Sequence, residues 1–154
     1  MAIALTIRPA QPTDLDAWRP LWDGYNAFYG RSGATALPEA VTQTTWARFF
    51  DANEPVHALV ALHGERLVGL THILFHRSTT LIGPTCYLQD LFTVADLRGQ
   101  GVGAALIEAA AAQARAAGAA RLYWMTHETN ATAMRLYDRV AEKTGFQVYR
   151  QVLS

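Results

Sequence analysis

The segment Arg98–Gly103 constrains the fold of this chain more than any other. Its sequence, Arg-Gly-Gln-Gly-Val-Gly, lies between an apolar run at 87–94 and an alanine-rich stretch at 102–117. These patterns are typical of a strand and a helix. A strand that turns through glycines into a helix directs free backbone N–H groups and the positive end of the helix dipole toward one point, which can bind phosphate. Because Gly101 and Gly103 lack a Cβ atom, a pyrophosphate could approach the main chain closely.

The spacing of the glycines distinguishes this junction from other known glycine-rich phosphate loops. A helix start that is rich in glycine only for packing fits the residues of the loop equally well. A dinucleotide-binding fingerprint needs a third glycine at the position of Leu106, and a nucleoside-triphosphate loop needs Gly-Lys followed by Ser or Thr, which is absent. The spacing therefore favours another kind of phosphate loop, with Arg98 adding a charge-assisted contact at its rim.

Length and composition exclude several classes of protein. The 154 residues fit one domain, 1–154, and thirteen basic residues balance thirteen acidic ones, which disfavours nucleic acid as a partner. The sequence predicts neither a secretory signal nor a membrane span, so we expect a cytoplasmic protein without a membrane partner.

The single cysteine, Cys86, excludes an intramolecular disulfide, and we expect it to be buried in a strand. His57, His63, His72 and His76 lack the spacing of metal ligands, so we expect no metal site.

The whole pattern predicts an α/β fold with a mixed sheet, in the order β-α-α-β-β-β-α-β-α-β. Strands are expected at 3–8, 56–62, 67–75, 87–94, 121–126 and 146–152, and helices at 13–28, 38–50, 102–117 and 132–143. The first helix carries aromatic residues at helical spacing, which favours a stripe facing the core over a ligand surface. These residues are Trp18, Trp22, Tyr25, Phe28 and Tyr29. The cluster Tyr25, Asn26 and Tyr29 need not all be core.

Two motifs together resemble one known family. The first is Arg-x-x-Gly-x-Gly at 98–103, placed in mid-chain after a strand. The second is Asn130-x-x-Ala133-x-x-Leu136-Tyr137, followed by Gly145-Phe146. Both resemble the GNAT superfamily of N-acyltransferases, and the residues around them are similar to the branch that holds histone and polyamine acetyltransferases. The resemblance implies the GNAT-like fold and acetyl-CoA as co-substrate.

The resemblance also implies which residues contact the coenzyme. The strand at 91–93 would bind the pantetheine arm through its main chain, the loop would hold the pyrophosphate, and a tyrosine would face the sulfur. The implied contacts are Leu91, Phe92, Thr93, Arg98, Gly99, Gln100, Gly101, Val102, Gly103, Ala104, Asn130 and Tyr137.

Acetyl transfer to an amine requires two proton movements. At pH 7 the neutral form of an alkylamine lies about 4.6 kcal/mol above its ammonium form, so a base must take a proton. Asp90 is our candidate, with His127 and Glu128 as alternatives. The departing thiolate needs a donor, and Tyr137 is the natural general acid. Candidate acceptor-binding residues are Tyr25, Tyr29, Tyr87, Gln89 and Trp124, together with Trp22 and Asn26. In polyamine acetyltransferases a glutamate typically stands at the position of Gln89.

The sequence therefore predicts an acetyl-CoA-dependent N-acetyltransferase that acts by direct transfer on a primary amine. The acceptor would be a small amine, a polyamine-like molecule or a lysine side chain of a peptide. The alternatives are a non-catalytic acyl-CoA-binding module of the same fold and an enzyme that uses a larger acyl group. We also expect a homodimer, because the last strand, up to Leu153, could add to a partner's sheet edge.

Overall fold

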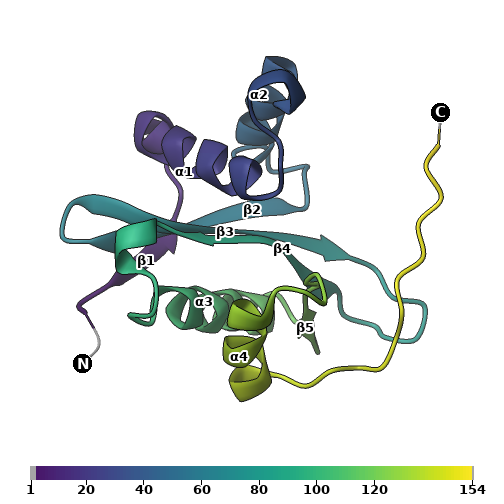
Figure 1. Cartoon of the computed structure of the whole chain (residues 1–154). Coiled ribbons are helices and arrows are strands. Elements are labelled where there is room, and N and C mark those ends of the chain that lie inside the picture. Colours follow the sequence, from purple (N-terminus) through teal and green to yellow (C-terminus); the bar gives the residue numbers. More distant parts are fainter. Residues whose placement is uncertain (1–2, 154) are drawn as a thin grey trace.

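The computed structural model describes residues 3–153, and its centre is a five-stranded mixed sheet in the order β1-β2-β3-β4-β5. Neighbouring strands are antiparallel except β4 and β5, which are parallel. Helices α1 and α2 cover one face, and α3 and α4 lie on the other (Figure 1). The predicted α/β class with a mixed sheet is confirmed. The strands are β1 (Thr6–Pro9), β2 (Val56–His63), β3 (Arg66–His76), β4 (Thr85–Thr93) and β5 (Leu122–Tyr123), and the helices are α1 (Leu15–Phe28), α2 (Glu39–Arg48), α3 (Val102–Ala116) and α4 (Ala131–Val140).

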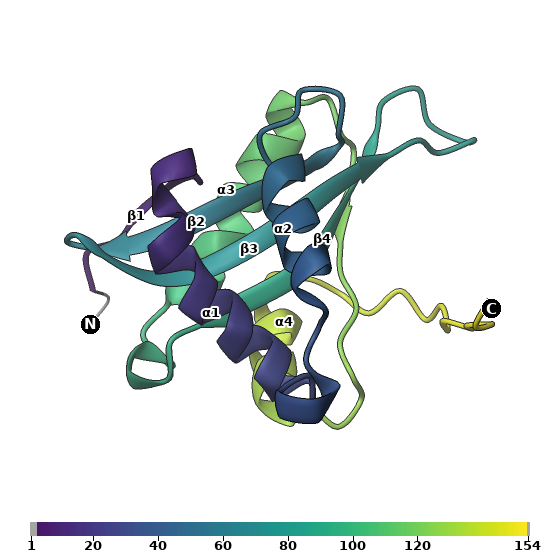
Figure 2. The same cartoon turned by 90° about the horizontal axis from the view of Figure 1, so that it is seen from above.

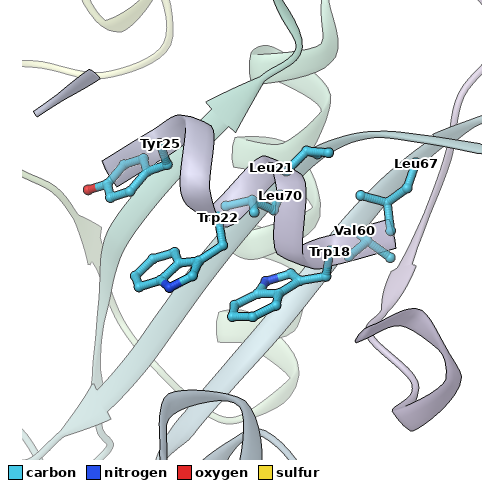
Figure 3. Packing of buried hydrophobic residues seen from close by; sticks show 7 residues of the cluster. All are labelled: Trp18, Leu21, Trp22, Tyr25, Val60, Leu67 and Leu70. Atoms are coloured by element: carbon cyan, nitrogen blue, oxygen red, sulfur yellow. The ribbon is translucent and has the colours of Figure 1, made fainter. Parts of the chain in front are cut away.

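The face under α1 is an aromatic core. Trp18 and Trp22 are buried and stacked, with ring centroids 5.6 Å apart. Figure 3 shows them in one cluster with Val60 and Leu70 of the sheet. The predicted core stripe is confirmed for Trp18, Trp22 and Tyr25, whereas Phe28 and Tyr29 are exposed. The end of α1 is thus free to line a site.

The opposite face is packed by the small residues of α3. Ala110 and Ala114 are buried against the sheet, where they share one cluster with the buried Cys86 of β4. A Cβ atom at Gly69 of β3 would lie 2.8 Å from Val102, so the glycine lets the start of α3 approach the sheet. Burial raises the pKa of the Cys86 thiol to about 11, which makes it a poor nucleophile at neutral pH.

Several predicted boundaries shift. The first strand lies at Thr6–Pro9 instead of 3–8, and α1 begins at Leu15 instead of 13 because a short 3-10 turn, Pro12–Asp14, precedes it. The second helix begins after Pro38, which is its N-cap, and ends at Arg48 instead of 50. The two strands predicted at 56–62 and 67–75 both form and pair as a hairpin, β2–β3, with Gly64 at φ 62° in its turn.

The C-terminal predictions are the ones that fail. The strand expected at 121–126 is reduced to Leu122–Tyr123, and the helix expected to reach 143 ends at Val140. The strand expected at 146–152 does not form, because this segment lies away from the sheet and pairs with no strand among residues 3–153. Figures 1 and 2 both show it leaving the body of the molecule.

Candidate active site

A cavity of about 670 Å³ opens between the end of β4, the glycine loop and α4. It is lined by every coenzyme contact that the family resemblance implies, except Gln100. Residues separated by some forty positions in the sequence therefore meet in one place. Phe28 and Tyr29, the exposed end of α1, line the same cavity.

The glycine loop presents the start of α3 to this cavity. Gly101 is the N-cap of α3 and has φ 89°, and Gly99 has φ 77°. Both φ values lie in the left-handed region, which residues with a Cβ atom rarely adopt. Within residues 3–153 no side chain caps α3, so its first N–H groups remain available to a ligand. The arrangement fits an anionic group such as a diphosphate.

Gly103 has a packing role that the sequence does not reveal. A Cβ atom there would lie 3.3 Å from Cδ2 of Leu136 in α4. The glycine therefore lets α4 approach α3 closely. Because α4 forms one wall of the cavity, this contact helps to set the cavity's width.

Three arginines surround the cavity. The Arg98 Nε donates a hydrogen bond to the backbone oxygen of Thr93 at 3.2 Å, and its guanidinium lies 5.5 Å from the ring centroid of Phe92. Arg135 and Arg139 of α4 also line the cavity. No sequence motif indicated these two, although their spacing of four puts them on one helix face. Together the three side chains give the cavity a positive rim.

Tyr137 lies on the inner side of α4 and lines the same cavity. Its ring packs edge-on against Trp124, with centroids 5.4 Å apart. Burial, with a smaller effect from Tyr29, raises the pKa of the Tyr137 phenol. The phenol therefore keeps its proton at neutral pH, as a proton donor must.

A second cavity, of about 190 Å³, lies on the α1 and α2 side of the sheet. Gln89 and Asp90 both line it, although neighbours in a regular strand face opposite ways. The pairing explains this: His72 faces Asp90 but Ile73 faces Leu88, so Gln89 is the extra residue of a β-bulge. The bulge moves Asp90 away from the face of Leu88 and into the cavity.

A buried chain of hydrogen bonds fixes Asp90. Trp18 Nε1 lies 3.1 Å from His72 Nε2, and His72 Nδ1 lies 2.8 Å from Asp90 Oδ2. An indole N–H can only donate, so Nε2 accepts and the imidazole proton stays on Nδ1, where it is donated to the carboxylate. This hydrogen bond holds Asp90 in place through Oδ2, and the other carboxylate oxygen, Oδ1, takes no part in it.

Tyr25 links the two cavities. It lines the larger one, and its phenol is close enough to Asp90 for the carboxylate to influence it. Burial, followed by the negative charge of Asp90, raises the pKa of Tyr25. The guanidinium of Arg31 lies 5.9 Å from the Tyr25 ring and 5.5 Å from the Tyr29 ring, and it donates to Asn26 Oδ1 at 2.7 Å.

The predicted acceptor residues do not all meet. Tyr25 and Tyr29 line the larger cavity, and Gln89 with Trp22 lines the smaller one. Tyr87 and Trp124 line neither, because Tyr87 stacks on Tyr123 at 4.9 Å and Trp124 packs on Tyr137.

The three candidate bases, like the acceptor residues, do not all line a cavity. Asp90 lines a cavity, whereas His127 and Glu128 are exposed in the loop before α4 and line neither cavity. His127 Nδ1 instead lies 2.7 Å from the hydroxyl of Thr129.

Two further polar residues of the smaller cavity come from α2, namely Thr45 and Arg48. Arg48 lies in the last turn of α2 and is paired loosely with Glu54, with Nε 3.8 Å from Oε1. The sequence gives no sign of either residue, because α2 carries no motif and only its packing over the sheet brings them beside Asp90. The cavity thus contains one cationic and one anionic side chain.

The comparisons with known proteins show that this fold is that of an acyltransferase. The model of the Acetyltransferase (GNAT) family matches residues 18–141, which include both cavities. The chain therefore belongs to the GNAT acetyltransferase family.

Individual relatives support the same class. The chain is 32% identical to the D-amino-acid N-acetyltransferase HPA3 of Saccharomyces cerevisiae, over 96% of this chain and 90% of that protein. It is 30% identical to an uncharacterised N-acetyltransferase, YhfO, of Bacillus subtilis, over 94% of this chain and 95% of that one.

Solved structures share the fold over nearly the whole chain. A probable acetyltransferase superposes with a TM-score of 0.83 at 25% identity, covering 97% of this chain and 98% of that one. The aminoglycoside N-acetyltransferase AAC(6')-Iy, solved in complex with CoA, superposes with a TM-score of 0.80 at 17% identity, over 99% of this chain and 97% of that one.

Proposed function

We propose that this protein is an acetyl-CoA-dependent N-acetyltransferase that moves an acetyl group directly to a primary amine. One observation carries the proposal: the uncapped start of α3 and the protonated phenol of Tyr137 line the same cavity. We further propose that residues 1–154 act as one domain and that the protein is a homodimer.

The larger cavity fits the parts of acetyl-CoA. Free N–H groups at Gly101 and along the first turn of α3, with Arg98, Arg135 and Arg139 around them, suit a diphosphate. The backbone of residues 91–93 suits the amides of the pantetheine arm. The thioester supplies the acetyl group, and Tyr137 donates a proton to the departing sulfur.

Asp90 accepts the proton of the acceptor's ammonium group. His72 holds the carboxylate through Nδ1, so its orientation does not depend on the ligand. The acetyl group moves to the freed nitrogen without an enzyme-bound intermediate, which is consistent with the burial of the only thiol, Cys86.

The smaller cavity favours an acceptor that carries a carboxylate as well as an amine, that is, an amino acid. Asp90 suits the ammonium group and Arg48 the carboxylate, while Trp22, Phe49 and Leu74 suit an apolar side chain. The relative from Saccharomyces cerevisiae is named as a D-amino-acid N-acetyltransferase, which supports this choice. Other primary amines, including small amines, polyamine-like molecules and protein lysines, are the competing acceptors.

Thiol release from acetyl-CoA tests the proposal with a matched panel: D- and L-forms of one amino acid, its amide, and the amine that lacks the carboxylate. We expect release with the amino acid to be at least tenfold faster than with the amine. Arg48→Gln should remove that preference, and Arg115→Gln, at the exposed end of α3, should keep it. Binding of acetyl-CoA without release on any amine would favour the non-catalytic module instead.

A further inference from the structure

The larger cavity carries positive charge that its own walls do not neutralise. Arg98 lines it at the glycine loop, and Arg135 and Arg139 line it from α4. Within residues 3–153, no aspartate or glutamate is among the side chains that line it. The chain as a whole is balanced, with thirteen basic and thirteen acidic residues. The excess of positive charge is therefore local to this cavity, and it indicates an anionic ligand.

Arg135 and Arg139 are a pair without an anionic partner in the described part of the chain. Neither takes part in an ion pair among residues 3–153, and Asp138, which stands between them in the sequence, does not line the cavity. Residues four apart on a helix have Cβ atoms about 5–6 Å from each other. Two guanidinium groups at this spacing can bind the oxygens of one phosphate together.

The packing of α4 holds this pair beside the glycine loop. Leu136 Cδ2 lies only 3.3 Å from the place that a Cβ atom of Gly103 would occupy. Arg135 directly precedes Leu136, and Arg139 follows it by three residues, so both side chains flank this contact. The arginine pair therefore lies next to the start of α3, where we place the diphosphate of acetyl-CoA.

The diphosphate alone does not match the charge of the cavity. It carries about two negative charges, whereas the three guanidinium groups and the N-terminus of α3 supply about three and a half positive ones. Coenzyme A has one further anionic group, the phosphate on the 3' position of its ribose. A phosphate monoester carries a charge of about −1.5 to −2 at pH 7. With this group included, ligand and cavity agree to within about half a charge.

We propose that Arg135 and Arg139 bind the ribose 3'-phosphate of coenzyme A, while Arg98 and the first turn of α3 bind the diphosphate. The inference rests on the proposed binding of acetyl-CoA in the larger cavity. The ribose alone separates the two phosphate groups in coenzyme A, so two neighbouring cationic sites suit them. The arginine pair of α4 is then a determinant of specificity for the coenzyme, and it takes no part in the proton transfers.

This assignment has a consequence for the choice of acetyl donor. A thioester carried on the phosphopantetheine arm of a carrier protein has no ribose and no 3'-phosphate. Such a donor leaves both guanidinium groups of α4 without an anion. The cavity should therefore discriminate in favour of free acetyl-CoA.

The test is calorimetric titration of the full-length protein with coenzyme A and with 3'-dephospho-coenzyme A, which differ only in this phosphate. We expect coenzyme A to bind at least about tenfold more tightly. In the double variant Arg135→Gln with Arg139→Gln, the affinities for the two ligands should agree to within about threefold, because only coenzyme A loses a contact. Both arginines are exposed, so the fold should survive the change.

Two further variants serve as controls. Arg98→Gln should weaken both ligands alike and keep the preference for coenzyme A, because it removes a contact to the diphosphate that the ligands share. Arg115→Gln removes one positive charge from the exposed end of α3 and should change neither affinity.

The outcomes separate this inference from the proposed function. Equal affinities of the unmodified protein for both ligands would overturn the inference and leave the binding of acetyl-CoA in place. A double variant that loses affinity for both ligands alike would overturn it too, because the pair would then bind the diphosphate. If neither ligand binds the unmodified protein, the inference and the proposed function both fail.

Discussion

The indole N–H of Trp18 donates a hydrogen bond to Nε2 of His72 across 3.1 Å, and this contact decides which nitrogen of His72 faces Asp90. Because Nε2 is occupied as an acceptor, Nδ1 carries the proton and donates it to the carboxylate 2.8 Å away. Trp18 lies on α1, His72 on β3 and Asp90 on β4. The packing of α1 on the sheet therefore determines how His72 is hydrogen-bonded to the candidate base Asp90.

Trp18→Phe should therefore cost more than the loss of packing alone. The change leaves Nε2 of His72 buried without a donor, which costs about 1–3 kcal/mol. Trp46→Phe is the matched control, because Trp46 packs in the same cluster with its ring 4.7 Å from that of Trp18. Urea unfolding should show a larger loss for Trp18→Phe by about that amount. Equal losses would mean that the hydrogen bond adds nothing.

Asp90→Asn should lower kcat/KM for the amine by about a hundred- to ten-thousandfold, because an amide cannot accept the ammonium proton. The affinity for acetyl-CoA should change little, since Asp90 lines only the smaller cavity. Steady-state rates and calorimetric titration measure the two quantities. Asp23→Asn on the exposed side of α1 is the control. Retention of full activity by Asp90→Asn would exclude this residue as the base.

Tyr137→Phe should lower turnover by about ten- to a thousandfold with little effect on acetyl-CoA affinity, because only the donated proton is lost. The reaction needs the protonated phenol, so turnover falls as the pH rises through the pKa of Tyr137. Since burial raises this pKa above its usual value near 10, the decline should begin above pH 10 and should be absent in the variant. Unchanged turnover would remove Tyr137 from the mechanism.

Local patterns predicted the parts of the fold that local interactions decide. Apolar runs indicated β2, β3 and β4, and the alanine-rich run indicated α3. The glycine loop was predicted because glycine at a positive φ leaves a signature in the sequence itself. The segment 146–152 has an equally good local pattern, but a strand also needs an edge to pair with, and the sequence does not say which chain provides it.

The candidate site was predicted where a motif runs along one segment and missed where distant segments meet. Arg48 reaches the smaller cavity only through the placement of α2, and His72 reaches Asp90 only through the register of β3 on β4. The bulge at Gln89 was invisible as well, although it decides which way Asp90 points. Tyr87 was selected for its aromatic character alone, and it packs on Tyr123 instead of lining a cavity.

Gly101→Ala should weaken acetyl-CoA binding, because alanine at φ 89° costs about 1–2 kcal/mol and the loop can relieve this strain only by turning its N–H groups away. Gly64→Ala in the β2–β3 turn, at φ 62°, introduces a comparable strain far from the cavity and is the matched control. Calorimetric titration should show weaker binding for Gly101→Ala only. Equal affinities in both variants would argue that the loop does not grip the diphosphate.

The ion pair between Arg8 and Asp14 should make stability depend on pH in the acidic range. Two hydrogen bonds join the guanidinium to the carboxylate, with Nη1 2.6 Å from Oδ2 and Nη2 2.9 Å from Oδ1, and the backbone N–H of Gln11 also donates to Asp14. Chiefly the hydrogen bond from Arg8 lowers the pKa of Asp14. The stabilisation is therefore complete above the unfolded pKa of about 3.9 and is lost as the pH falls below it.

Asp14→Asn should accordingly lower the free energy of unfolding by about 1–3 kcal/mol at pH 7, since the carboxylate is mostly buried. The difference from the unmodified protein should shrink as the pH falls below about 4. Asp96→Asn breaks a pair of the same geometry with Arg66, but both partners are exposed to solvent, so its effect should be smaller. Urea unfolding at a series of pH values measures both variants. A deficit for Asp14→Asn that stays constant from pH 7 to pH 3 would mean that the ionised pair does not stabilise the start of α1.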